Sequence, residues 1–235
     1  MTTRLRGRSF ADGAITSAKI AADAVTADKI PANAIGSSEL DLTANYAFTG
    51  TVSGAGGNVL EMLAGVCDGR TVTVPSGSYT LQNVNAEFPL TTSYQDITGS
   101  VLSYTPPSGT KIVVYRYQCS VDSEGYSGIS HFKFFIDSTE VIPAYRSLAP
   151  GEYVSQAHHN SEYMFEWPIQ CDAASDDAAN GKFSSWTSAK TLKLSAREYG
   201  GSYGLRLHHN VWRNGDGAAS PYNLAVPTLT IIALK

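Results

Sequence analysis

The first forty residues of the chain repeat themselves with a period of ten. Segments 14–20, 24–30 and 34–40 align position by position, and each opens with Ala followed by Ile or Val. A step of five residues turns a side chain by about 140° on an α-helix and changes its face on a strand. A winding path of short extended pieces and tight turns therefore fits best. Its large apolar residues recur at every fifth position: Ile15, Ile20, Val25, Ile30, Ile35 and Leu40.

The repeat carries too little apolar surface to fold as a single chain. Its six large side chains do not offset a backbone ordering cost of roughly 1–2 kcal/mol per residue. We therefore expect a fibrous shaft over residues 13–42, with a core formed by association of three chains. The alternative is an Ala-rich helix over residues 18–29, where helix propensity is good. The shaft is favoured because the heptad pattern is absent and Pro31 interrupts a long helix.

Residues 1–12 precede the repeat, and Arg4, Arg6 and Arg8 share one face if this segment is extended. One interpretation is an attachment arm, since a fibre must be held at one end. The alternative is a solvated terminus. No apolar stretch typical of a secretory signal follows these arginines.

Composition favours strands and excludes two classes of partner. The chain of 235 residues is 16% charged and holds 13 Tyr and 21 Gly, a balance typical of strands and turns. A net charge of −4, without a long basic run, excludes nucleic acid. The mostly apolar run 224–234 is too short to cross a bilayer, so we expect no membrane insertion. Cys67, Cys119 and Cys171 are widely spaced, which predicts free thiols and agrees with assembly in a reducing cytoplasm.

The ten-residue period ends after the shaft, and residues 43–88 are expected to form a small neck. The Gly-rich run 53–57 marks a hinge, because no Lys-Ser/Thr pair or βαβ pattern of a phosphate loop follows it. The apolar residues in 59–66 suggest a short helix. Residues 71–81 predict a hairpin around the turn at 75–78.

Residues 89–235 contain runs of alternating polarity separated by turn clusters. We expect eight or nine strands, a count that suits a jelly-roll β-sandwich. The apolar positions predicted to share a face are Val113, Tyr115, Tyr117 and Cys119; Phe132, Phe134 and Ile136; Leu192, Leu194 and Ala196; and Leu205, Leu207, His209 and Val211.

These features resemble a known group of viral proteins. The Ala-Ile/Val-Thr-x-x-Lys-Ile repeat resembles repeats of phage fibre proteins, and the run 65–81 looks like a segment of marine-phage structural proteins. The head is similar to the trimeric tumour-necrosis-factor/C1q-like jelly roll in its segment 103–110 and its closing strand 227–234. The resemblance implies an all-β chain with a trimeric fibrous shaft, a small neck and a C-terminal jelly-roll head. It carries no catalytic residue.

Two identical tripeptides, His158-His159-Asn160 and His208-His209-Asn210, offer possible metal ligands near a threefold axis. Adjacent residues on a strand point to opposite faces, however, so each pair offers at most one histidine to a common site. Loop 172–180 holds oxygen donors for Ca²⁺ but lacks the spacing of an EF-hand, and a solvated loop is favoured. We expect no metal and no cofactor.

No catalytic motif stands out. Serines are plentiful but none lies in a Gly-x-Ser-x-Gly elbow. Carboxylates that are candidates for a glycosidase pair occur without a motif to single them out: Glu124, Glu140, Glu162 and Glu166.

The sequence therefore predicts a non-enzymatic phage virion fibre, on tail or head, assembled in the host cytoplasm. It is expected to be a homotrimer, held by another virion protein at its N-terminus, with a head that adheres to a host surface glycan or protein. One alternative is a capsid decoration or structural fibre without a receptor role. The other is a glycan-degrading tailspike.

The long turn-rich segments 171–187 and 213–222 are the expected receptor loops. The resemblance to trimeric jelly rolls implies that they lie at the end of the head far from the N-terminal connection. The alternative is that Phe183 and Trp186 fill the core. The candidate contact residues are Phe183, Trp186, Asn214, Asp216 and Tyr222.

Overall fold

The computed structural model describes residues 16, 20, 30, 58–123, 128–149, 159–210 and 223–235. The chain divides into two compact units, Met1–Ser53 and Gly54–Lys235. In the first unit Ile20 and Ile30 are 46% and 41% exposed. The homotrimeric shaft stays a prediction. The other residues predicted for the arm and the shaft lie outside the described residues: Arg4, Arg6, Arg8, Ile15, Val25, Ile35 and Leu40.

The second unit is an all-β sandwich of two six-stranded sheets, which we call the β7 sheet and the β12 sheet after their central strands. The β7 sheet contains β1 (Val59–Val66), β4 (Phe88–Pro89), β7 (Ile112–Ser123), β11 (His159–Gln170), β13 (Leu205–Leu207) and β14 (Thr228–Leu234). The β12 sheet contains β5 (Gln95–Asp96), β6 (Leu102–Tyr104), β8 (Ser130–Ile136), β9 (Thr139–Glu140), β10 (Arg146–Leu148) and β12 (Lys190–Glu198). A hairpin of β2 (Thr71–Val74) and β3 (Gly77–Thr80) and two 3-10 turns, η3 (Ile142–Ala144) and η4 (Ala178–Asn180), complete the described elements.

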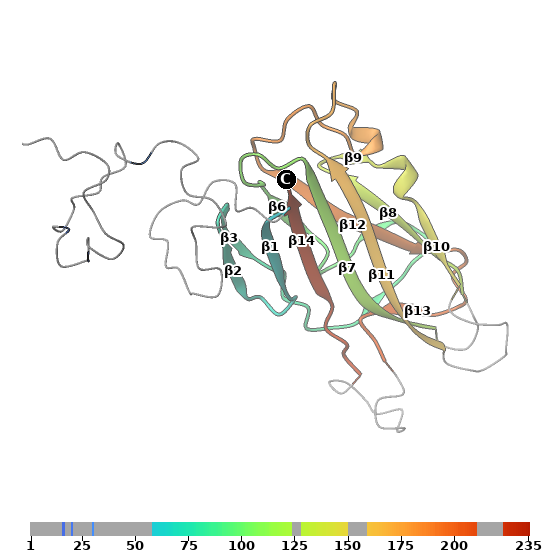
Figure 1. Ribbon diagram of the computed structural model, residues 1–235. Coiled ribbons are helices and arrows are strands. Elements are labelled where there is room, and N and C mark those ends of the chain that lie inside the picture. The colour runs from blue at the N-terminus through green and yellow to red at the C-terminus, as the bar shows by residue number, and fades with distance from the viewer. Residues whose placement is uncertain are drawn as a thin grey trace, which may run out of the picture. The chain divides into compact units, whose positions relative to one another are not determined.

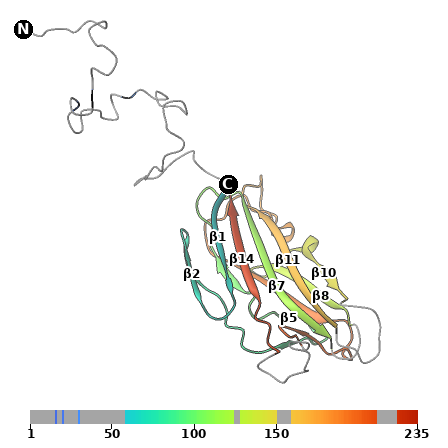
Figure 2. The same cartoon turned by 60° about the horizontal axis from the view of Figure 1, so that its bottom comes forward.

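Neighbouring strands of the β7 sheet follow the order β1-β14-β7-β13-β4, with β11 along the other edge of β7. The β12 sheet follows the order β10-β8-β12-β5, with β6 on β12 and β9 on β8. The two sheets face each other as layers (Figures 1 and 2). The chain changes sheet from β4 to β5, β6 to β7, β7 to β8, β10 to β11, β11 to β12 and β12 to β13. This alternation between antiparallel sheets is the connectivity of a jelly roll, and the predicted all-β fold is confirmed.

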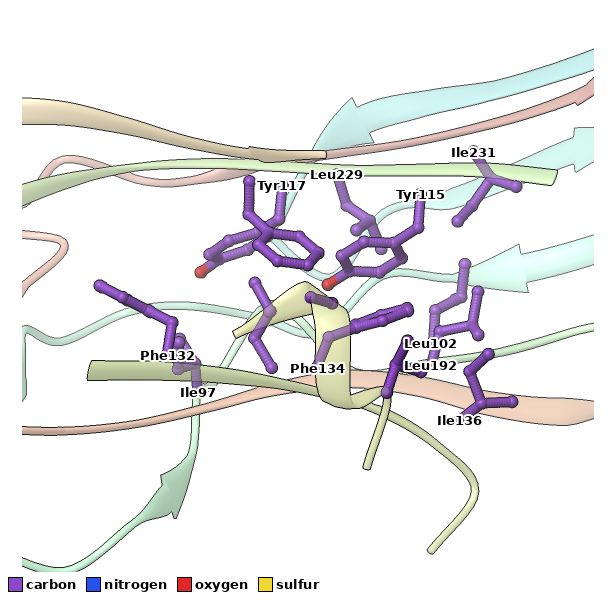
Figure 3. Packing of buried hydrophobic residues seen from close by; sticks show 14 of the residues in the cluster. Ile97, Leu102, Tyr115, Tyr117, Phe132, Phe134, Ile136, Leu192, Leu229 and Ile231 are labelled. Carbon is purple, nitrogen blue, oxygen red and sulfur yellow. The ribbon is translucent and has the colours of Figure 1, made fainter. Parts of the chain in front are cut away.

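Alternating side chains of the facing sheets fill the core (Figure 3). Tyr115 of β7 meets Phe134 of β8 at a ring-centroid distance of 4.9 Å, and Phe165 of β11 lies 5.3 Å from Phe134. The Tyr115 hydroxyl donates a 2.7 Å hydrogen bond to the carbonyl oxygen of Ser100, so its polar end is satisfied inside the core. The alternation predicted for these strands is therefore confirmed.

Residues 59–66 form strand β1 rather than the expected short helix. Seven of the eight residues of β1 pair antiparallel with β14, and the register shifts between Val59 and Glu61. Its residues are apolar in a nearly continuous run, which periodicity cannot assign to helix or strand, and the free edge of β14 decides the outcome. Residues expected in the neck thus contribute strands and core side chains to the head, which begins before residue 89.

The buried carboxylate of Glu61 ties the predicted hairpin, which is confirmed as β2 and β3, to the sandwich. It accepts hydrogen bonds from the Tyr104 hydroxyl at 2.5 Å and from the Ser76 backbone N–H and hydroxyl at 2.9 and 2.7 Å. These donors satisfy a charge that burial otherwise makes costly. Burial and this contact raise the pKa of Tyr104 well above its usual range.

The strand expected over 205–212 ends at Leu207. His208 adopts a left-handed backbone with φ of 63°, a conformation that bulky residues rarely take. Leu205 and Leu207 are buried as predicted, but the alternation is reset at His208. The prediction that His209 continues their face is wrong.

We expect Phe134→Ala to lower the free energy of unfolding by about 3–5 kcal/mol, because it removes a fully buried ring that contacts two others. Phe135→Ala on the opposite, half-buried face of β8 is the matched control and should cost clearly less. Urea denaturation of both variants measures the difference. Equal losses would contradict the assigned faces of β8.

Candidate functional site

The outer face of the β7 sheet, the face turned away from the core, carries a row of apolar side chains. Met62, Ile232, Val114 and Pro168 are cross-strand neighbours on β1, β14, β7 and β11. They alternate with buried residues of the same strands, which turns them outward. Met62 is 57% exposed. Four adjacent strands thus present apolar groups to solvent.

The next outward row is Ala64, Thr230, Arg116 and Glu166. Arg116 donates a 2.6 Å hydrogen bond from Nε to Glu166, so its charge is paired on the face itself. Met164, also on β11, is 57% exposed. We call this surface the outer apolar face. It is a candidate interface, because monomeric soluble proteins rarely leave large contiguous apolar patches open.

Sequence reasoning missed this face, although a signal existed. The run Ile231–Leu234 is apolar at four successive positions instead of alternating. Such runs are typical of strands covered on both faces.

The two histidines of the second tripeptide face different environments. The Nε2 of buried His208 lies 2.7 Å from the Tyr117 hydroxyl, and burial lowers the pKa of His208 to about 4. His209 Nδ1 lies 2.9 Å from Asp122 Oδ2, and its Nε2 lies 3.5 Å from Glu87 Oε2. The expectation that adjacent histidines do not share a site is confirmed for this pair.

The structure describes the first tripeptide only in part, since His158 and the His159 side chain lie outside the described residues. Across the described part of the chain, no group of three or more His, Cys, Asp or Glu side chains gathers as metal ligands.

The carboxylates of loop 172–180 fasten the loop itself. Asp176 accepts two 2.7 Å hydrogen bonds, from the backbone N–H and hydroxyl of Ser184, and these hold its pKa below the usual range. Asp177 accepts one from the Asn180 amide at 2.7 Å. These oxygens are therefore used in turn formation.

Two of the carboxylates considered for a glycosidase pair neutralise cations. Glu140 pairs with Lys133 at 2.8 Å, and Glu166 pairs with Arg116. Glu162 is exposed, and Glu124 lies outside the described residues. The surroundings of Glu140 and Glu166 favour ion pairing over acid–base chemistry.

The aromatic residues predicted to contact a receptor are in the core. Phe183 and Trp186 are 5% and 6% exposed, their rings lie 5.8 Å apart, and Trp186 packs edge-on against Tyr104 at 6.2 Å. The alternative that they fill the core is confirmed, and the prediction of exposed aromatic contacts is wrong for both. Asn214, Asp216 and Tyr222 lie outside the described residues.

Loop 171–187 lies at the end of the sandwich where the chain enters the head. The Cys171 N–H donates to the carbonyl of Lys111 at 2.7 Å, and the Lys235 N–H donates to that of Asn58 at 2.7 Å. Residues 111 and 235 adjoin the paired ends of β7 and β14. The expectation that this loop lies at the far end of the head is therefore wrong.

The three cysteines are buried and form no disulfide. Burial raises the pKa of Cys67 to about 12 and that of Cys171 to about 11, so both stay protonated thiols at neutral pH. This agrees with the predicted free thiols. Within the part of the chain that the structure describes, no helix has the length and apolarity to span a membrane.

The sequence matches no family of known proteins and no curated protein. Solved structures with some likeness include infectious bursal disease virus strain Gx, at 12% identity and TM-score 0.30, covering 69% of this chain and 40% of that one. Another is a mutant VP2 protein in T=1 particles of that virus, at 12% identity and TM-score 0.24, covering 70% and 41%. This chain thus spans about two fifths of their length. A likeness of this size carries no inference, and the fold assignment rests on the strand topology.

We expect the buried His208 to make the protein less stable as pH falls. Its pKa drops from 6.5 to about 4 on folding, so the unfolded chain binds more protons between these values. Stability present above pH 6.5 is lost progressively down to about pH 4, by about 2 kcal/mol between pH 7 and 5. Urea denaturation at both pH values measures this loss. His208→Gln should abolish most of the pH dependence, and an unchanged dependence in this variant would contradict the assignment.

Proposed function

We propose that this protein is a non-enzymatic structural component of a virion, a trimeric fibre of the phage type whose head is the jelly-roll sandwich. The observation that carries the proposal is the outer apolar face, with Met62, Ile232 and Val114 side by side on three strands. A sheet face of this kind gains stability only when another surface covers it. A further copy of the same chain is the occupant that symmetry favours.

The N-terminal repeat supports the same occupant. The five-residue spacing of its apolar residues predicts no core within a single chain. The two described members, Ile20 and Ile30, are exposed. Fully burying one such side chain stabilises by about 1.5–3 kcal/mol, whereas association costs an estimated 4–15 kcal/mol or more. When the repeat and the sheet face are both covered, several apolar side chains are buried, and their summed stabilisation offsets the cost of association. Association of three copies covers both surfaces and leaves neither exposed.

The paired carboxylates support a role without catalysis. Glu140 and Glu166 are held by cations, and a general acid or base needs a titrating group free to exchange a proton with substrate. The functions proposed instead are attachment to the particle and adhesion to the host. The N-terminal segment attaches to another virion protein, and the head adheres to a glycan or protein on the host surface. A capsid decoration fibre uses the same architecture without the last role.

Native mass spectrometry of the full chain should give three times 25.0 kDa. Ile20→Asp with Ile30→Asp should loosen the shaft and leave the head trimeric. Adding Ile232→Asp should then give monomers, because it places a charge in the middle of the outer apolar face. Ile142→Asp, at a 66% exposed site on η3, is the matched control and should leave the trimer intact. A well-folded wild-type monomer at micromolar concentration would refute the assembly.

Immunogold labelling of purified particles with an antibody against the head should find the protein on the virion. Purified protein should also compete with particles for adsorption to host cells. Labelling without competition would favour the decoration fibre. Release of reducing ends from host glycan, lost in a single carboxylate variant, would favour the tailspike. Absence from the particle would overturn the virion assignment.

A further inference from the structure

A pocket of about 440 Å³ opens at the end of the β7 sheet where β7 begins. Its rim carries three lysines, Lys111, Lys182 and Lys235. The indole of Trp167 and the ring of Pro168, both on β11, contribute apolar surface. The volume lies in the range of sites for small molecules. We call this site the lysine pocket.

Backbone pairing brings the three lysines together from distant parts of the sequence. The Lys111 N–H donates to the Leu234 carbonyl at 2.8 Å, which sets Lys111 beside the residue that precedes Lys235. Lys182 forms a parallel bridge with Gln170, the last residue of β11. Since β11 pairs with β7 up to this end, the lysines lie on three neighbouring chain segments.

The charges of these lysines are not neutralised within the described part of the head. The six lysines of residues 58–123, 128–149, 159–210 and 223–235 fall into two groups. Each member of the group on the β12 sheet has a carboxylate within 4 Å: Lys133, Lys190 and Lys193.

No ion pair with a described residue involves a lysine of the pocket. The one acidic group among the described lining residues, Asp172, accepts a hydrogen bond from Gln170 at 3.2 Å. Three like charges held close together repel one another, in a protein whose net charge is −4. The pocket therefore presents a local positive potential that favours an anion.

The apolar part of the pocket is held in place from two sides. The Arg146 guanidinium lies 5.7 Å from the centre of the Trp167 ring. A Cβ on Gly181 would come within 2.9 Å of Trp167 Nε1, so only glycine lets this backbone, with φ of 68°, approach the indole. Trp167 and Pro168 follow each other on β11 and therefore point to opposite faces of the strand. The fixed indole is the ring that offers a rigid apolar surface to the carbon-bound face of a sugar.

We propose that the lysine pocket binds a carboxylated sugar, such as a uronic acid residue of an acidic glycan. The ammonium groups hold the carboxylate, the sugar ring lies against the Trp167 indole, and the Asn180 amide and Asp172 carboxylate at the rim hydrogen-bond hydroxyls. The proposal names the ligand class for the proposed adhesion, so the biological role of the binding rests on the proposed function. The binding itself does not, because every residue that lines the pocket belongs to one chain.

The test is calorimetric titration of the full-length, associated protein with trigalacturonic acid and, in parallel, with neutral maltotriose. The acidic trisaccharide should bind at least tenfold more tightly, and its affinity should fall as NaCl is raised. Lys111→Gln and Lys182→Gln should each weaken it about two- to fivefold, the range for partly exposed ion pairs. Lys193→Gln removes the same charge from the β12 sheet and should leave affinity unchanged.

Equal affinity for both trisaccharides, or equal losses in Lys182→Gln and Lys193→Gln, would overturn the proposal. So would absence of binding, including a pocket closed by association, since Pro168 also belongs to the outer apolar face. The two proposals fail separately. If the protein binds the uronate but is absent from particles, the pocket proposal stands and the virion role is refuted. If the protein is present on particles but does not bind the uronate, the virion role stands and the pocket proposal is refuted.

Discussion

Strand β7 pairs with β11 along all of its twelve residues, and its other edge is shared by β14 and then β13. Pairing along both edges fixes which residues of the neighbouring strands face the core, because a slip of one residue in register would exchange the two faces of the sheet. Tyr115 and Tyr117 then point into the core, while Val114 and Arg116 point outward. The core, the outer apolar face and the row of lysines at the end of the sheet all follow from this one register.

Strict alternation is the part of the fold that could be predicted from the sequence. On β8, Phe132, Phe134 and Ile136 are buried as predicted, because one face of that strand is solvated and the pattern is unambiguous. Strand β1 has apolar residues on both faces, so only its distant partner β14 distinguishes it from a helix. His208 escaped prediction for another reason. Its left-handed backbone reflects its tertiary contacts, among them Tyr117, which no local pattern contains.

The sites were less predictable than the fold, since they depend on register and not on local motifs. Phe183 and Trp186 follow an acidic run in a loop, which is typical of an exposed site. In the folded loop, however, both are buried, with Trp186 against Tyr104 and Phe183 against Trp186. The pocket lysines at 111, 182 and 235 lie too far apart in sequence to form a motif. They meet because three chain segments end side by side. The sequence alone does not distinguish a lysine in an ion pair from one without a carboxylate neighbour.

The pairing of β1 with β14 also has a mechanical consequence. A pull on Asn58, the residue before β1, would act beside the end of β14. A pull along β1 loads the hydrogen bonds of its seven paired positions in shear, all at once, rather than opening them one by one. Glu61 adds an anchor from β1 to Ser76 and Tyr104. The segment predicted as a short helix is thus a strand whose pairing would resist a pull on its N-terminal end.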